Sequence, residues 1–134
     1  MFLLDTDMVI FSLKGHPIIR ENLQRHRHDP LKISSITIME LYYGAFKSQR
    51  TAGNLAKVKT LEHTIDIISV GLETAELFGM IKAQLETKGK RLDDFDLIIA
   101  ACALAHNLTL VTNNTDHFSR ITDLKLVNWC ISLQ

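Results

Sequence analysis

The chain begins with Phe2-Leu3-Leu4-Asp5-Thr6-Asp7, a short apolar run that leads directly into two acids. A run of this kind predicts a buried strand, here over residues 2–5. In a parallel α/β sheet, the carboxyl ends of the strands face the crevice in which ligands bind. The segment therefore predicts that the first strand carries Asp5 to a ligand-binding edge of the sheet.

The rest of the sequence alternates between strand and helix patterns. Further strands are expected over 31–36, 65–70, 108–112 and, as an optional fifth, 124–127. Helices are expected over 7–14, 17–28, 51–63, 73–88 and 95–106, with another that starts at residue 37. This alternation predicts an α/β fold in which helices cover both faces of a parallel sheet of four to five strands.

Three local signals refine two of these helices. Thr37-Ile38-Met39-Glu40 has the spacing of a capping box, which predicts that a helix starts at Thr37. Gly44 lies inside that helix, where glycine is costly unless another backbone packs closely against it, so we expect such a neighbour. Gly89 follows the helix at 73–88 and is expected to end it.

The composition is that of a soluble globular protein. The 134 residues fit a single domain, 1–134, and 46% of them are hydrophobic against 22% charged. The apolar stretches are too short to cross a bilayer, and the N-terminus lacks the basic segment of a signal peptide. We therefore expect a cytoplasmic protein without a membrane partner. The two cysteines lack metal-ligand spacing and are expected to stay reduced.

The net charge is zero, because 15 basic residues balance 15 acidic ones. This balance gives no global signal for nucleic-acid binding. Basic residues nevertheless gather in four places, at 25–28, 47–50, 57–59 and 88–91. Each group is explained most simply as a solvated surface, but together they could supply the positive rim that a phosphate backbone needs.

Four acids are expected to meet at the carboxyl edge of the sheet: Asp5, Glu40, Asp96 and Asp116. Taken singly, most have a purely structural explanation, as helix caps for Asp5 and Glu40 and as an Asx turn for Asp116. Asp96 resists such an explanation because it lies in the first turn of an apolar helix. A lone buried charge there would cost several kcal/mol unless it were paired or bound to a metal.

Taken together, clustered carboxylates repel one another and would partly protonate unless a cation were bound. A site built from oxygen ligands suits Mg²⁺, or Mn²⁺ as a substitute. Such an ion can activate water and stabilise the leaving oxygen of a phosphodiester. The acids therefore predict metal-assisted hydrolysis of a phosphoester.

Four segments of the chain resemble, in the same order, the motifs of PIN-domain ribonucleases, and most closely those of VapC toxins from type II toxin–antitoxin systems. The segments are Leu3-Leu4-Asp5-Thr6-Asp7, the run from Ile36 to Gly44, Asp96-Leu97-Ile98-Ile99-Ala100-Ala101, and the run from Leu110 to Phe118. Each motif is weak alone, whereas all four in order are specific. The resemblance spans essentially the whole chain.

The resemblance implies a three-layer α/β/α fold and an Mg²⁺-dependent endoribonuclease that cuts transfer or ribosomal RNA and so inhibits translation. It makes Asp5 and Asp96 the metal carboxylates, adds Glu40 to the acidic cluster, and places the Thr112 hydroxyl near the site. It also implies a homodimer that is silenced by a VapB-like antitoxin, in a larger complex that binds operator DNA.

The sequence departs from the family pattern in two places. Position 7 is Asp, where the family more often has Asn, so this residue either adds charge near the metal or caps a helix. Asn114 and His117 stand at the positions where relatives carry their last acid. Asp116 is therefore the remaining candidate for a fourth catalytic acid, in the outer shell of the site.

Two other functions remain open at this point. Asp5 and Asp7 also resemble the nucleophile and the general acid–base of haloacid-dehalogenase phosphatases, although the chain is short and lacks that family's late Gly-Asp-x-x-x-Asp motif. A non-catalytic PIN-like module that binds RNA or protein is the second alternative. In either RNA-binding case, the basic segment 88–91 is the best candidate for the point of RNA entry. The aromatic residues Tyr42, Tyr43 and Phe46 could stack on bases, but they are expected to pack against neighbouring helices or a dimer partner.

Overall fold

Five parallel strands form the centre of the computed structural model, which describes residues 1–131. Their order across the sheet is β3-β2-β1-β4-β5, and every neighbouring pair is parallel. The strands are β1 (Phe2–Leu4), β2 (Leu31–Ser34), β3 (Asp66–Ile68), β4 (Thr109–Val111) and β5 (Leu126–Val127). The predicted parallel sheet is confirmed, and the optional fifth strand is present.

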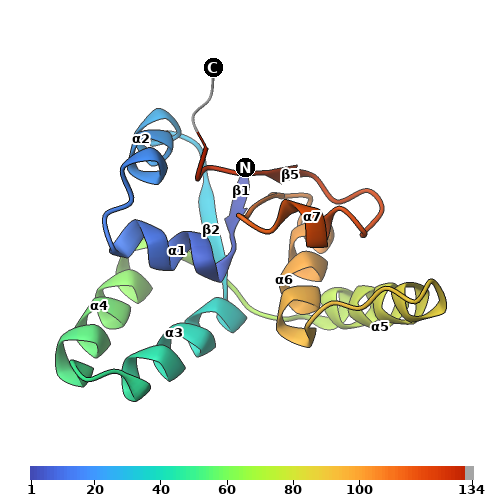
Figure 1. The fold of residues 1–134 in the computed structure, drawn as a ribbon, viewed down its shortest axis with the longest axis horizontal. Helices are drawn as coiled ribbons and strands as arrows, with labels where there is room; N and C mark the ends of the chain where they lie inside the picture. The colour runs from blue at the N-terminus through green and yellow to red at the C-terminus, as the bar shows by residue number, and fades with distance from the viewer. Residues whose placement is uncertain (132–134) are drawn as a thin grey trace.

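Seven helices connect and cover the strands in the described residues (Figure 1). They are α1 (Thr6–Leu13), α2 (Pro17–Arg25), α3 (Ser35–Lys47), α4 (Thr51–Thr64), α5 (Leu72–Thr87), α6 (Asp94–Ala105) and α7 (Thr115–Phe118). In Figure 1, α1 to α4 lie on one side of the strands and α5 to α7 on the other. No helix in this part of the chain combines the length and apolar character that a membrane crossing requires.

The strands alternate between two hydrophobic cores, one on each face of the sheet. In β1, Leu3 packs with α5 and α6, whereas Leu4 packs with α1, α3 and α4. In β4, Leu110 belongs to the same core as Leu3, and Val111 belongs to the same core as Leu4. Because successive side chains of a strand point to opposite faces, two fully buried neighbours require a covered sheet on both sides. The expected three-layer α/β/α arrangement follows from this packing.

The start of α3 differs from the predicted one. The helix begins at Ser35 rather than Thr37, and its N-cap is Ser34, whose hydroxyl accepts a hydrogen bond from the Thr37 amide at 3.2 Å. The predicted capping box is therefore wrong. Its Thr37 lies one turn too far inside the helix, so Glu40 is not needed for capping and its carboxylate can serve another role.

The two glycines named above behave differently. Gly89 has a φ of +68° and follows Lys88, the C-cap residue of α5, as predicted for a helix-ending glycine. Gly44 is exposed, and a Cβ atom added there would meet no atom within 4 Å. The expected close backbone neighbour is absent among the described residues, so nothing in the packing of this chain requires glycine at that position.

Candidate active site

Asp5 occupies the position directly after β1, and both of its carboxylate oxygens are held. Its Oδ1 accepts a hydrogen bond from the Thr6 amide at 2.8 Å, and its Oδ2 accepts one from the Thr112 hydroxyl, also at 2.8 Å. The side chain is only 4% exposed. Since Thr112 follows β4, the pairing of the two central strands fixes the Asp5 carboxylate in one orientation.

Thr112 is fully buried and is itself oriented by the loop that follows it. Its hydroxyl accepts a hydrogen bond from the Asn114 amide at 3.0 Å while donating to Asp5. The hydroxyl that the family resemblance placed near the site thus contacts the first acid directly.

A chain of hydroxyl groups holds Glu40 beside Asp5. The Thr6 hydroxyl donates to Glu40 Oε1 at 2.7 Å and lies 3.0 Å from the Thr37 hydroxyl. A threonine hydroxyl has a single proton, and Thr6 uses it in the hydrogen bond to Glu40. Thr37 must therefore be the donor in the hydrogen bond between the two threonines. Ser34 in turn lies 3.5 Å from Thr37 as a donor. The hydrogen bonds therefore run from Ser34 through Thr37 and Thr6 to the Glu40 carboxyl group.

Asp96 reaches the same region from the first turn of α6, which starts after the N-cap residue Asp93. Burial raises the pKa of Asp96 to about 6, and the negative charges of Asp93, Glu40 and Asp7 add to the increase. His117 acts in the opposite direction. The charge of this half-buried acid is therefore opposed by an acid at the start of its own helix and by acids from two other segments, α1 and α3.

Burial also raises the pKa of Asp5, to about 7, with further contributions from the charges of Asp7 and Asp96. The hydrogen bonds from Thr112 and Thr6 oppose this increase because they stabilise the ionised form. The mutual effects on pKa therefore join Asp5, Asp7 and Asp96 into one electrostatic unit.

Asp7, which the sequence left as either a helix cap or an added charge, belongs to this unit. Burial raises its pKa, and its Oδ1 atom is buried without a hydrogen-bond partner in the described structure. An unpaired buried carboxylate oxygen is costly, so it points to a missing donor or cation. The sequence signal was the two-residue spacing from Asp5 at the start of a helix.

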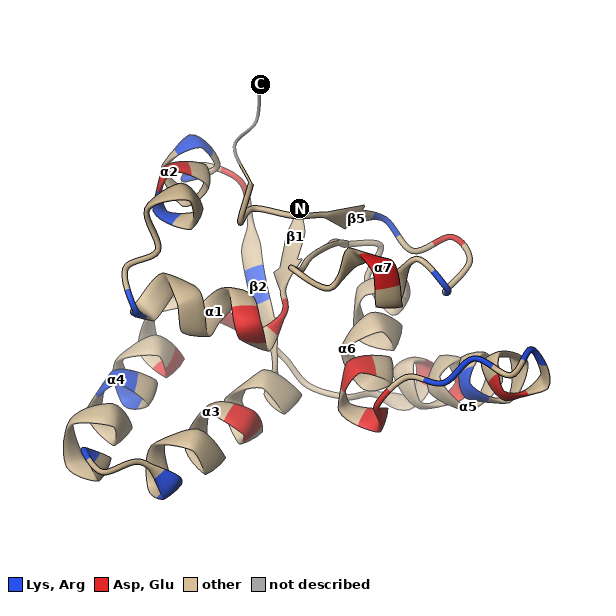
Figure 2. Ribbon diagram, in the orientation of Figure 1, with Lys and Arg blue, Asp and Glu red and all other residues tan. Residues whose placement is uncertain are grey.

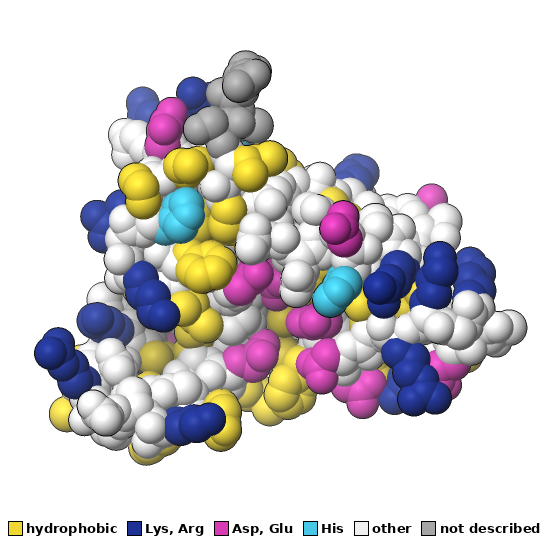
Figure 3. Space-filling model, viewed as in Figure 1, with side chains coloured by type: hydrophobic (Ala, Val, Ile, Leu, Met, Phe, Trp, Pro, Cys, Tyr) yellow, Lys and Arg dark blue, Asp and Glu magenta, His cyan; other side chains and the backbone are white. Residues whose placement is uncertain are grey.

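Figure 2 shows the acids of α1, α3 and the start of α6 on the same central side of the ribbon, and Figure 3 shows acidic side chains gathered there on the surface. Asp116 is different: it lies in the short helix α7, with an exposed side chain. In residues 1–131, no side-chain hydrogen bond links it to the other acids, and its neighbour His117 is the group that acts on Asp96.

The donor set suits a hard divalent cation. It consists of carboxylate oxygens, two of the acids have strongly raised pKa values, and one buried oxygen lacks a partner. Among residues 1–131, however, no group of three or more His, Cys, Asp or Glu side chains is placed so that it could hold a metal ion. Mg²⁺ keeps several of its waters and needs only one or two direct carboxylates, so the acids present fit that ion.

Some residues that the sequence singled out lie elsewhere. Tyr42 is half-buried and donates a hydrogen bond to Glu62, so it packs within the chain. Tyr43 and Phe46 are 67% and 66% exposed, so within this chain they do not pack against neighbouring helices, and the expected packing against a dimer partner stays a prediction. Their exposed surface lies on α3 (Ser35–Lys47), the helix that also carries Glu40.

Comparisons with known proteins give a consistent picture. The family model described as the PIN domain matches residues 2–124. The chain is 38% identical to a protein of Shigella flexneri named tRNA(fMet)-specific endonuclease VapC, over 96% of this chain and 97% of that protein. It is 35% identical to ribonuclease VapC2 of Rickettsia felis, over 96% of this chain and 98% of that protein.

Solved structures of toxin–antitoxin complexes also resemble the chain over nearly its full length. The VapBC2 complex of Rickettsia felis bound to a DNA fragment from its promoter superposes with a TM-score of 0.89 at 35% identity. The DNA-bound VapBC complex of Salmonella typhimurium gives the same TM-score at 38% identity. Each comparison covers 96% of this chain and 98% of the other.

Proposed function

The chain belongs to the PIN domain family, and from this premise we propose that it is an endoribonuclease toxin of the VapC type whose reaction depends on a bound divalent cation. The observation that carries the proposal is the position of Asp5. It is buried, oriented through both oxygens, and coupled electrostatically to Asp7 and Asp96. The match to the PIN domain over residues 2–124 favours this function over a phosphatase of the haloacid-dehalogenase type.

Asp5 and Asp96 would hold the ion, which we propose to be Mg²⁺ with Mn²⁺ as a substitute, and Asp7 offers its unpaired oxygen. When bound, such an ion supplies an activated water and stabilises the oxygen that leaves the phosphodiester. The chain contributes orientation: Thr6 and Thr112 fix the Asp5 carboxylate before any ligand arrives.

Glu40 has a separate task in this proposal. Its carboxylate is held by the Thr6 hydroxyl, on the same residue whose amide holds Asp5. An oriented carboxylate next to the metal carboxylates can accept a proton from the attacking water. Asp116 is retained as an outer candidate, and its exposed position at α7 suits contact with substrate better than contact with an ion.

The proposed substrate is transfer RNA or ribosomal RNA, and the supporting comparison is the Shigella relative, named for its action on tRNA(fMet). The VapBC complexes with DNA support a VapB-like antitoxin as partner and operator DNA as the target of the complex. We further propose a cytoplasmic homodimer. The exposed apolar residues Met39, Tyr43 and Phe46 on α3 support a dimer surface close to Glu40.

The proposal is tested by incubating the purified chain with transfer RNA and Mg²⁺, with and without a chelator. We expect cleavage that the chelator abolishes, and a loss of at least about 100-fold in Asp5→Asn and Asp96→Asn. Asp66→Asn, at the exposed amino end of β3, serves as the matched control and should keep most of the activity. Cleavage that persists in either of the first two variants would contradict the site assignment.

Two further results would identify the alternatives. Binding of RNA without cleavage in either Mg²⁺ or Mn²⁺ would favour a non-catalytic module. Release of phosphate from a small phosphomonoester, with phosphate trapped on Asp5, would favour the phosphatase.

A further inference from the structure

A group of basic side chains lies beside the acid cluster, on the side formed by α5, the connection after it, and the residues after α7. We name this group the α5–α6 rim. It comprises Lys82, Lys88, Lys90, Arg91 and Arg120. Figure 3 shows dark-blue side chains extending from the acids and the neighbouring histidine along this side of the surface.

Specific contacts bring the rim together from distant parts of the chain. Arg120 Nη1 donates to the backbone carbonyl of Arg91 at 2.9 Å, across 29 positions of sequence. Lys82 Nζ contacts Asp94 at 2.9 Å, at the start of α6 and two residues from Asp96. The side chains of Lys90 and Arg91 are exposed, and no described hydrogen bond or ion pair engages them. Their charges are therefore available to a ligand.

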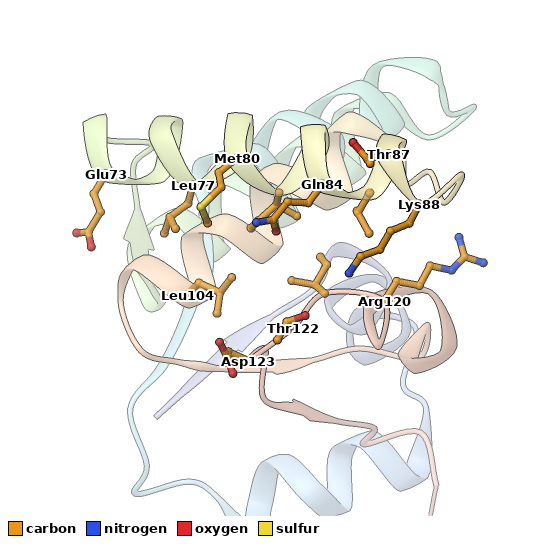
Figure 4. Close-up of a pocket in the computed structure, with 13 residues that line it drawn as sticks. Glu73, Leu77, Met80, Gln84, Thr87, Lys88, Leu104, Arg120, Thr122 and Asp123 are labelled. Carbon is orange, nitrogen blue, oxygen red and sulfur yellow. The ribbon is translucent and has the colours of Figure 1, made fainter.

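The surface is hollowed in two places beside α5. One hollow, of about 270 Å³, is lined by Lys82, Lys90 and Arg91 and reaches the acids Asp93 and Asp94. A larger cavity, of about 710 Å³, lies between α5 and the residues after α7. Figure 4 shows Lys88 and Arg120 at the same end of this larger cavity. Lys82, Lys90 and Arg91 thus line recessed surface that reaches the start of α6, the helix that carries Asp96.

A polyanion that approaches the acid cluster needs such a surface. Asp5, Asp7, Glu40 and Asp96 repel phosphates, and the zero net charge of the chain provides no long-range attraction. Attraction must therefore come from local cations within about 10 Å of the strand, the screening distance at moderate salt. We propose that the α5–α6 rim binds the phosphodiester backbone of single-stranded RNA and guides it into the acid cluster. This inference rests on the proposed function.

The test compares pairs of exposed cations, each replaced by serine so that every variant loses two positive charges. The rim variant is Lys90→Ser with Arg91→Ser. The control variant is Arg25→Ser with Lys125→Ser, because these residues lie near the amino ends of β2 and β5, at the opposite edge of the sheet. A third variant, Lys47→Ser with Lys57→Ser, examines the cations of α3 and α4.

Binding is measured first, by fluorescence anisotropy of a labelled single-stranded RNA in the Asp96→Asn background, so that cleavage plays no part. We expect the rim variant to raise Kd by about tenfold or more. Because each phosphate contact on a single strand contributes about 0.7 to the salt slope, the slope of log Kd against log salt should fall by about 1.4. The control variant should change neither value.

Cleavage is then measured with the natural acids in place. The rim variant should raise KM while kcat stays within about twofold, since the rim contacts RNA away from the reacting bond. An unchanged Kd, an equal loss in the control variant, or a loss confined to Lys47 and Lys57 would each overturn the proposal. A chain that binds RNA through the rim but does not cleave it would refute the nuclease function, whereas the proposal that the rim binds RNA would still hold. Thermal unfolding of each variant verifies that it is folded.

Discussion

At the scale of single residues, Thr6 holds two carboxylates, those of Asp5 and Glu40, through two different groups. Its amide donates to Asp5, and its hydroxyl donates to Glu40. The amide contact survives any substitution of the side chain except proline, whereas the hydroxyl contact does not. Thr6 is therefore a positioning residue whose two contacts can be separated by mutation.

Replacing Thr6 by valine keeps the shape of the side chain but removes the hydroxyl. Glu40 then loses its only described hydrogen-bond donor, and we expect kcat for RNA cleavage to fall by about 10- to 100-fold with little change in KM. Thr6→Ser restores the hydroxyl and should restore most of the rate. An equal loss in both variants would mean that packing, rather than the contact with Glu40, is what matters at this position.

At the scale of elements, two glycines have no neighbouring atom beside the position of a Cβ but differ in backbone conformation. One lies inside α3 and the other follows α5. Gly44 lies inside α3, whereas Gly89 has a φ of +68° after α5. Neither would meet a neighbouring atom through an added Cβ. Because neither site is crowded, a difference in stability between the two alanine variants reports the effect of backbone conformation rather than of steric overlap.

We expect Gly44→Ala to stabilise the fold by about 0.5–1 kcal/mol, because alanine restricts the unfolded chain and favours a helix interior. Gly89→Ala should destabilise it by a similar amount, since a side chain disfavours positive φ. Denaturant unfolding of both variants measures the two changes. A loss of stability in Gly44→Ala would show that something outside the described contacts occupies the space beside α3.

The same element scale shows where sequence patterns reach their limit. The apolar helix at α6 and the alternating strands could be predicted, because their signals are periodic and local. The start of α3 could not: Ser34 and Thr37 are both good capping residues, and Ser34 is the last residue of β2 to pair with β3, opposite Ile68. The short helix α7 was also missed, because four residues carry too little periodicity.

At the scale of the whole molecule, folding gathers acids that would be far apart in the unfolded chain. The pKa of Asp5 is raised from 3.8 to about 7 and that of Asp96 to about 6, mainly by burial. Between about pH 4 and 7 the folded state therefore keeps protons that the unfolded state releases. For such groups, stability falls as the pH rises through this window.

This linkage predicts how stability without metal depends on pH. Asp5→Asn removes the titrating group, so the variant should melt near the wild-type temperature at pH 4 and several degrees above it at pH 7.5, in the presence of a chelator. Saturating Mg²⁺ binds the folded state and should raise the wild-type melting temperature more at pH 7.5 than at pH 4. A variant that is less stable than the wild type at pH 7.5 would contradict the raised pKa of Asp5.

The sequence by itself determined the alternation of strands and helices, the parallel sheet, and three acids at the carboxyl edge, Asp5, Glu40 and Asp96. These features follow from short-range periodicity and from the rule that parallel strands end on one side. Only the tertiary structure decided which groups hold those acids. The Thr112 hydroxyl reaches Asp5 across 107 positions and the Thr6 hydroxyl reaches Glu40 across 34, because β1 lies between β2 and β4. Local propensity cannot encode such contacts, and it likewise could not place Asp7 inside the acid cluster.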